Sequence, residues 1–381
     1  MAASQSTSTN TTNITTNATQ AHVPPEQLER VRRTLLRLLE VPGPSSFEAA
    51  AARAWRDEAA TFAEQADIDV HGSAFAGIHL RGAPCVLLTG HLDEIGLMLT
   101  HVDNEGYCYF STIGGWDPQV LVGQRVSILG RHGPVAGVIG RQATHLLESN
   151  ERDRAVKIKD LWIDIGATSR EQALAYVRPG DPVVLAAPPL ELRDGRLAGR
   201  GLDNRTGAVV VLEALRLLAE HPGSLRAAVW AAANAQEEIT GGGARAITYR
   251  LEPQVAVVVD VTHATDYPGA DRRRLGEHAL GSGPAIGRGS AAGPRVFQLL
   301  VEAAEAEGIP YTIEPTPGRT GTDAENVFAI RSGVATGLVS VPLRYMHSPN
   351  EVVQLSDMVH AARLLAAFCR RLSPDTDLRP V

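Results

Sequence analysis

Residues 225–233 read LRAAVWAAA, a short and almost continuously apolar run. Similar runs occur three more times, as CVLLTG at 85–90, VAVVVD at 255–260 and GLVSVP at 337–342. Apolar runs without alternation are typical of strands that are covered on both faces. Helical stretches lie between the runs, notably at 207–220 and 294–307. This alternation predicts an α/β domain, with a central mixed sheet that carries helices on both faces.

Residues 97–197 have a different pattern, with closely spaced Gly and Pro and short β-branched runs such as QRVSIL and AGVIG. An amphipathic helix is indicated only at 169–177. The pattern predicts a small β-rich, barrel-like domain inserted into the α/β domain, which then consists of 25–96 and 198–375. The charged segment 145–160 is expected to be a surface loop.

The N-terminal residues 1–24 form a polar tail, because fifteen of the first twenty residues are Ser, Thr, Asn or Gln. Such a segment buries too little apolar surface to offset its ordering entropy, and we expect it to be disordered. Apolar residues then recur at helical spacing from Leu28 to Leu38 and predict a helix. Ser45 and Glu48 have the spacing of a capping box at the start of a second helix.

The composition indicates an ordinary globular protein of two domains, since a single core rarely grows beyond about 250 to 300 residues and the chain has 381. The net charge of −7 argues against nucleic acid and anionic membranes as partners. We see neither a membrane span nor a signal peptide. Cys85, Cys108 and Cys369 are scattered without metal-binding spacing. We therefore expect a cytoplasmic protein.

Polar residues follow the apolar runs at the points where open α/β sheets place their ligands. The set contains two histidines, several carboxylates and no cysteine. Imidazole and carboxylate together suit zinc, cobalt or manganese, whereas a structural zinc site would normally include cysteine. The candidates are His91, Asp93, Asp203, Glu237, Glu238, Asp260 and His347.

This inventory matches the needs of two divalent cations about 3.5 to 4 Å apart, which share one carboxylate and have a histidine and an acid at each end. Asp203 would bridge the two ions. The terminal ligands would be His91, Glu238, Asp260 and His347. Glu237 remains free to act as the base, and Asp93 can accept the second N–H of the His91 ring.

Each of these residues also has a purely structural interpretation. A single histidine at a strand end is commonly a surface or satisfied core residue, and Asp203 could cap a helix. Asp260 could end a strand, and Glu237 with Glu238 could be solvated charges. The coincidence of all of them, each after a buried run or at a tight turn, favours a metal site.

Several longer motifs occur in order from about residue 88 to 352. They are GHLDEIGLM, GGWDPQVLVGQRV, LWIDIGA, GRGLDNRTG, the QEE turn, VVDVTHATD, GTDAENV and RYMHSPNEVV. In these motifs the sequence resembles the tetrahedral, or glutamyl-type, aminopeptidases, dinuclear metallopeptidases of which some are named endoglucanases. The resemblance implies the same metal ligands, with Glu237 as the acid/base. It places Asp93 next to the ligands, where it supports them without binding a metal itself. It also implies a dimerisation role for the β-rich domain and a homo-oligomer, at least a dimer, with the tetrahedral dodecamer that members often build as the larger alternative.

The expected function is the hydrolysis of N-terminal residues from peptides, through a hydroxide that bridges two metal ions, with zinc as the expected metal and cobalt or manganese as alternatives. The alternatives are a deacylase or amidohydrolase acting on N-acylated amino acids, an endoglucanase, and a shell protein without catalysis. The turn ITGGGA and Asp323 depart from the family pattern near the substrate pocket. Arg288, Arg319 and Arg344 could favour acidic substrates, although surface arginines are the commoner interpretation.

Overall fold

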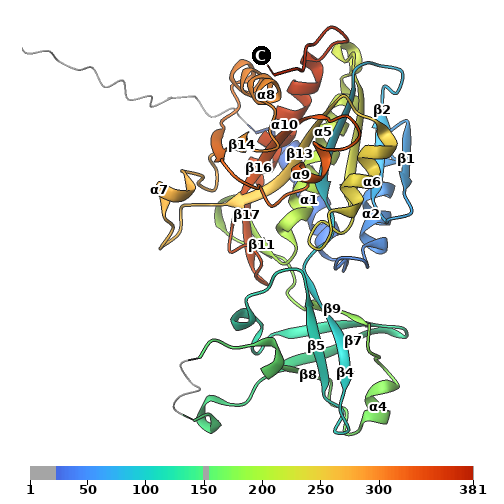
Figure 1. Ribbon diagram of the computed structural model, residues 1–381, viewed down its shortest axis with the longest axis vertical. Coiled ribbons are helices and arrows are strands. Elements are labelled where there is room, and N and C mark those ends of the chain that lie inside the picture. Colours follow the sequence, from blue (N-terminus) through green and yellow to red (C-terminus); the bar gives the residue numbers. More distant parts are fainter. Residues whose placement is uncertain (1–22, 149–153, 381) are drawn as a thin grey trace, which may run out of the picture.

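The computed structural model describes residues 23–148 and 154–380. It has two lobes, a large α/β lobe and a smaller β lobe beneath it (Figure 1). The predicted fold class is confirmed: a large mixed sheet with helices on both sides is accompanied by a closed antiparallel barrel. The predicted disorder of residues 1–22 lies outside the described residues, as does the part of the predicted surface loop at 149–153. Among the helices that the structure describes, none is long and apolar enough to cross a membrane.

The four apolar runs form four adjacent parallel strands in the middle of the large sheet. Within the described residues this sheet has eleven strands. Along its main path it contains β1 (Gln65–Ile68), β2 (Ala74–Ile78), β12 (Ala228–Asn234), β3 (Cys85–His91), β13 (Val255–His263), β16 (Ala335–Arg344), β17 (Glu351–Gln354), β11 (Arg196–Gly199) and β10 (Leu190–Glu191). In addition, β14 (Ala285–Gly289) pairs with β16, and β15 (Thr312–Thr316) pairs with β14.

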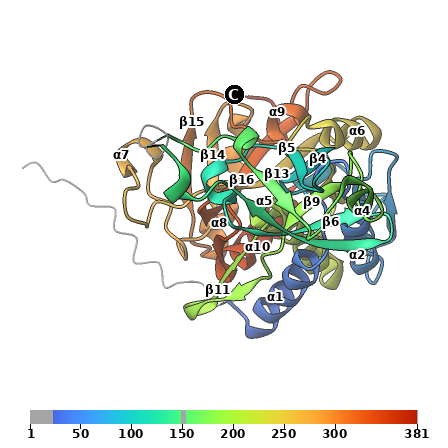
Figure 2. The same cartoon turned by 90° about the horizontal axis from the view of Figure 1, so that it is seen from below.

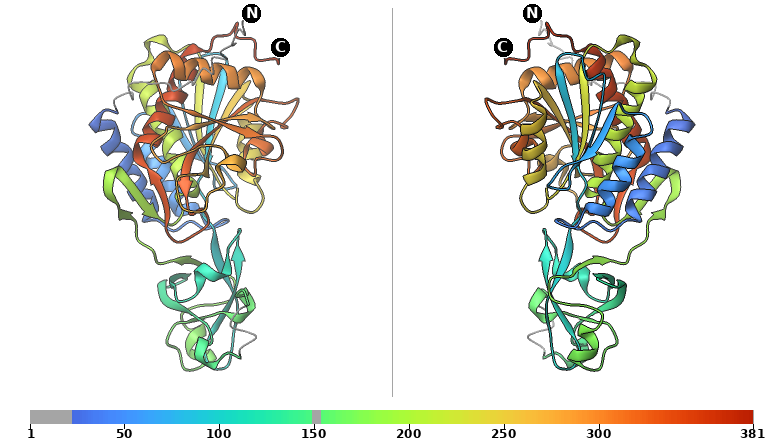
Figure 3. Two further views of the ribbon diagram at one scale, coloured as in Figure 1. Left: turned by 90° about the vertical axis from the view of Figure 1, so that its left-hand side faces the viewer. Right: turned by 90° about the vertical axis from the view of Figure 1, so that its right-hand side faces the viewer.

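Helices cover both faces of this sheet (Figure 3). On one face lie α1 (Pro25–Leu39), α2 (Ala49–Ala59), α5 (Leu202–Glu220), α8 (Pro294–Glu307) and α10 (Leu355–Arg371); on the other lie α6 (Gly242–Leu251) and the short α9 (Ala324–Val327). In β3, Val86 and Leu88 belong to the larger core, whereas Leu87 packs in the smaller one. Because successive side chains point to opposite faces, a strand between two helical layers must be apolar throughout.

When the molecule is seen from below, the barrel lies in front of the large lobe (Figure 2). In order around the barrel, its strands are β4 (Gly96–Val102), β5 (Cys108–Ile113), β8 (Trp162–Asp164), β7 (Gly133–Gly140), β6 (Arg125–Gly130) and β9 (Pro182–Leu185). It encloses a separate core that includes Leu97, Ile128 and Val183. The helix predicted at 169–177 is the short α4 (Arg170–Leu174), which Ser169 caps. A second short helix, α7 (Arg272–Leu275), belongs to the large lobe.

Two sequence predictions need correction. The segment 97–197 includes β10 and the start of β11, which are hydrogen-bonded in the large sheet and not in the barrel. The capping box is also wrong: the Ser45 hydroxyl donates to Asp93 at 2.6 Å, and Glu48 accepts from the backbone N–H of Gln236 at 3.0 Å. Both side chains therefore make long-range contacts next to the candidate site, which outweigh the local capping pattern.

Candidate metal centre

The predicted site residues come together at the carboxyl ends of the four parallel strands. His91 ends β3, Asp260 lies in the second half of β13, and His347 follows β16. The two glutamates lie in the turn after β12, and Asp203 lies in the first turn of α5. The carboxyl ends of parallel strands meet at one edge of a sheet, which is where α/β proteins bind their ligands.

Two groups of possible ligands share Asp203. One group contains His91, Asp203 and Asp260, and the other contains Asp203, Glu238 and His347; within each, the ligand atoms lie within 4.8 Å of one another. Nε2 of His91 is 3.1 Å from Oδ1 of Asp203, and Nε2 of His347 is 3.5 Å from Oδ2. The two oxygens of one carboxylate thus face two different histidines, which is the arrangement that a bridging ligand requires.

Glu237 and Glu238 differ in their neighbours. Oε1 of Glu238 is 3.4 Å from Nε2 of His347, whereas Oε2 of Glu237 is 3.8 Å from Nε2 of His91. A third group of possible ligands, however, contains His91 and both glutamates. Only Glu238 belongs to a group that includes the shared Asp203, so the geometry favours Glu238 as the ligand.

Asp93 connects the first histidine to the glutamate turn. The Nδ1 atom of His91 is 3.2 Å from the backbone carbonyl oxygen of Asp93 and 3.4 Å from its Oδ1. The same carboxylate accepts the backbone N–H groups of Glu237 at 3.1 Å and Glu238 at 3.2 Å, as well as the Ser45 hydroxyl. One buried side chain therefore orients both a candidate ligand and the pair of acids.

Residues 72–364 match the family of M42 glutamyl aminopeptidases. The chain belongs to this family. The lysyl aminopeptidase of Pyrococcus furiosus is 34% identical over 342 residues, which cover 89% of this chain and 96% of the relative. The M42 family is one of aminopeptidases, so the resemblance seen in the sequence and the predicted enzyme class are both confirmed.

Solved structures agree with this assignment. The TET aminopeptidase of a marine sediment Thaumarchaeota archaeon superimposes with a TM-score of 0.86 at 31% identity, covering 91% of this chain and 97% of that one. The Pyrococcus horikoshii TET1 peptidase, which can assemble into a tetrahedron or a large octahedral shell, gives 0.78 at 31% identity, covering 90% and 100%. The fold of this M42 peptidase is thus shared along almost its whole length.

The two histidines of the M42 site have raised pKa values. Burial alone would lower the pKa of His91, but its hydrogen bonds with Asp203 and Asp93 outweigh burial and raise that pKa well above its usual range. Hydrogen bonds with Asp203 and Glu238 raise the pKa of His347 to about 11. Both rings therefore lie in strongly negative surroundings, which suit a cation.

The carboxylates show the same excess of negative charge. Burial, followed by the charges of Asp260 and Asp323, raises the pKa of Glu237 to about 10. Burial also raises the pKa of Asp260 well above its usual value, and the charge of Asp203 raises it further. Acids packed this closely cannot all ionise unless positive charge is present. Because the donors are imidazole and carboxylate, the cluster fits divalent metal ions.

Glu351 is a functional residue that the sequence analysis missed. Its Oε2 accepts the backbone N–H of Asp203 at 3.0 Å, and its Oε1 accepts that of His347 at 2.9 Å. His347 has a φ of 59°, in the left-handed region that residues other than glycine rarely adopt. The Glu351 carboxylate thus fixes the backbone of two candidate ligands through these hydrogen bonds. The available signal was its position four residues after His347 in RYMHSPNEVV.

Glu351→Gln is expected to reduce metal affinity or turnover by about 10- to 100-fold, the usual cost of losing support behind a metal ligand. An amide has only one accepting oxygen, so its NH2 group would face one of the two backbone N–H groups. Competition with a chromogenic chelator measures the affinity. Glu305→Gln, an exposed glutamate on α8, is the matched control. Wild-type affinity and turnover in Glu351→Gln would rule out the positioning role.

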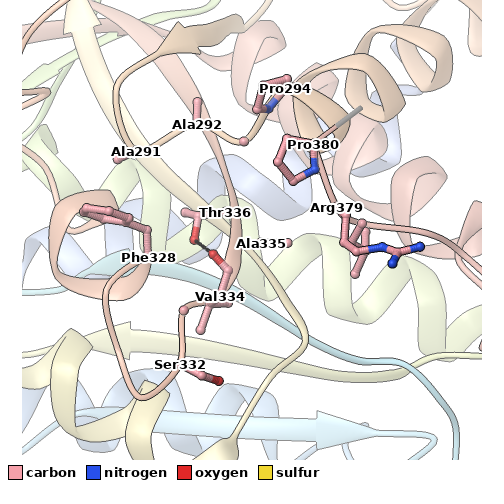
Figure 4. Close-up of a pocket in the computed structure, with 13 residues that line it drawn as sticks. Ala291, Ala292, Pro294, Phe328, Ser332, Val334, Ala335, Thr336, Arg379 and Pro380 are labelled. Atoms are coloured by element: carbon pink, nitrogen blue, oxygen red, sulfur yellow. Dashed lines mark hydrogen bonds between the residues drawn. The ribbon is translucent and has the colours of Figure 1, made fainter.

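Two cavities lie at opposite ends of β16. The candidate metal residues line a cavity of about 230 Å³ near the end of the strand. The other cavity, of about 560 Å³, lies at its beginning and is lined mainly by small and apolar residues such as Ala292, Pro294 and Phe328 (Figure 4). Among its described lining residues there is no histidine or acid, so of these two cavities only the smaller has a lining that could bind metal ions.

Proposed function

We propose that this M42 enzyme is a dinuclear metal-dependent aminopeptidase that removes single residues from the N-terminus of peptides. The observation that carries the proposal is the position of Asp203, whose two oxygens face His91 and His347 separately. Each half of the site then has one histidine, one acid of its own and a share of Asp203. This is the ligand set that a pair of divalent cations needs.

We assign one ion to His91, Asp203 and Asp260, and the other to Asp203, Glu238 and His347. Zinc suits these ligands, and cobalt and manganese are the alternatives. When bound, such ions polarise the carbonyl of the substrate and lower the pKa of water from about 15.7 to about 7.

Glu237 is assigned as the acid/base. Its carboxylate borders the cavity and lies outside both groups that share Asp203. It would accept a proton from the attacking water and then donate it to the nitrogen of the leaving amine, so that one group serves both halves of the reaction. Asp93 accepts the backbone N–H of Glu237 and so holds the backbone of the turn that carries this side chain.

The size of the cavity favours cleavage at the chain end. At about 230 Å³ it is smaller than the ~300 to 1,000 Å³ of most small-molecule sites, so it suits one residue and not a long segment. The Pyrococcus horikoshii TET1 peptidase can assemble into a tetrahedron or a large octahedral shell, which favours a homo-oligomer for this chain as well. We propose that the barrel lobe forms the dimer contact within such an assembly.

The test compares leucyl p-nitroanilide with its N-acetylated form, using protein loaded with zinc, cobalt or manganese. We expect hydrolysis of the free amine only, and loss of that hydrolysis when a chelator is added. Release of acetate from the N-acetylated substrate, without release of p-nitroaniline, would indicate a deacylase instead. Hydrolysis of a glucan in the presence of a chelator would indicate a glycosidase, which needs only two carboxylates.

A further inference from the structure

Glu314 is an acid in the metal-site cavity that belongs to none of the ligand groups. It lies in β15, and its Oε1 accepts the hydroxyl of Thr262 at 2.5 Å. Its Oε2 is buried and has no hydrogen-bond partner among the described residues. A buried carboxylate oxygen without a donor is unfavourable, so a bound ligand that donates to it gains affinity.

The position of Glu314 is fixed relative to the metal ligands. Thr262, which holds it, lies two residues after Asp260 on β13, and both residues line the cavity. Two residues along a strand span about 6.6 Å, so the residue that holds Glu314 is set off from Asp260 along the wall of the cavity. Rotation about the last side-chain torsion of a glutamate is broad, which allows Glu314 to turn its second oxygen toward a bound ligand.

The arginines considered in the sequence analysis do not counter this charge. Arg344 pairs with Asp266 at 2.6 Å, Arg288 stacks over the ring of Phe297, and the side chain of Arg319 is 93% exposed. In the described parts of the chain, neither an arginine nor a lysine lines the cavity. The surface interpretation therefore fits Arg288 and Arg319, whereas Arg344 is a half-buried ion-pair partner of Asp266. None of the three offsets the charge of Glu314 in the cavity.

We infer that Glu314 selects substrates whose N-terminal residue has a cationic side chain, lysine or arginine. The inference rests on the proposed function and adds a substrate class to it. The ammonium or guanidinium group would donate to the free oxygen of Glu314, while the scissile carbonyl lies at the metal ligands. An acidic N-terminal side chain would bring a second negative charge against Glu314 and would be rejected.

The test measures kcat/KM on the p-nitroanilides of lysine, arginine, norleucine, leucine and glutamate with the metal-loaded, full-length protein. Norleucine is close to lysine in length and lacks its charge. The wild type should prefer lysine and arginine to norleucine and should act least on glutamate. Glu314→Gln should lower kcat/KM for lysine and arginine by about 10- to 100-fold, as expected for one hydrogen bond to a charged group, and leave norleucine unchanged.

Two controls make the outcome specific. Unchanged turnover of norleucine shows that Glu314→Gln is folded and binds its metal. Glu305→Gln, the same substitution at an exposed position on α8, should leave the whole profile unaltered. In Thr262→Val, which removes the hydroxyl that holds Glu314, the preference for lysine over norleucine should weaken.

Three results would overturn the inference. They are a wild-type preference for glutamate, an unchanged ratio of lysine to norleucine in Glu314→Gln, and an equal loss on all five substrates. The last would mean that Glu314 holds the α-amine that every substrate shares. These results leave the proposed function intact, because they require cleavage by the wild type. A metal-loaded wild type that cleaves none of the anilides would refute the proposed function and, with it, this inference.

Discussion

Glu237→Gln is expected to lower kcat on an aminoacyl anilide by about 10²- to 10⁴-fold, the usual contribution of an acid/base group. The substitution keeps the shape of the side chain but removes its ability to take and return a proton. Because Glu237 lies outside both groups that share Asp203, we expect the metal content to stay at the wild-type level. Steady-state kinetics and elemental analysis by mass spectrometry on the same preparation measure both quantities.

The metal analysis separates two roles for Glu237. A third group of possible ligands joins it to His91 and Glu238, so a role as a ligand is the main alternative. A large loss of metal from Glu237→Gln would favour that alternative. Near-normal turnover with metal bound would remove Glu237 from the mechanism. Glu305→Gln should match the wild type in both measurements.

Asp203→Asn is expected to empty both metal positions and to abolish detectable turnover. Asp203 is the one residue common to the two groups, and the amide lacks the negative charge that two cations would share. Its backbone N–H still donates to Glu351, so the turn that carries it keeps its support. Metal content per subunit and circular dichroism should show a folded protein without bound metal.

Comparison with His347→Ala distinguishes the loss of both metal positions from the loss of one. His347 belongs only to the group with Glu238, so its loss should weaken one position and leave the position of His91 and Asp260 in place. If Asp203→Asn and His347→Ala both lost the same single ion, Asp203 would not be a bridge. If Asp203→Asn kept a full complement of metal, the assignment of the site would be wrong.

The central part of the fold could be predicted because its strands are buried on both faces. The run at 255–259 places Val257 in one core and Val258 in the other. Because successive side chains enter different cores, every residue of the run has to be apolar. The limits of the insertion were harder to predict. Leu190 and Glu191 in β10 are exposed, and nothing in so short a segment shows which sheet it will join.

The candidate ligands could be predicted because each lies directly after a buried apolar run or at a tight turn, where open α/β sheets bind their ligands. Glu351 and Glu314 gave a weaker signal. Glu351 acts through backbone N–H groups of residues that only tertiary folding brings together, although it is close to His347 in sequence. Glu314 lies between Ile313 and Pro315 in a strand that pairs only with β14 among the described strands, and its sequence context does not indicate a site.

The most direct test of the dinuclear site is a titration of metal-free wild-type protein with zinc, in which bound metal and leucyl p-nitroanilide hydrolysis are recorded together. We expect two bound ions per subunit, no turnover before zinc is added, and full turnover only when both ions are bound. Full turnover with one ion per subunit, or in the metal-free protein, would contradict the dinuclear site.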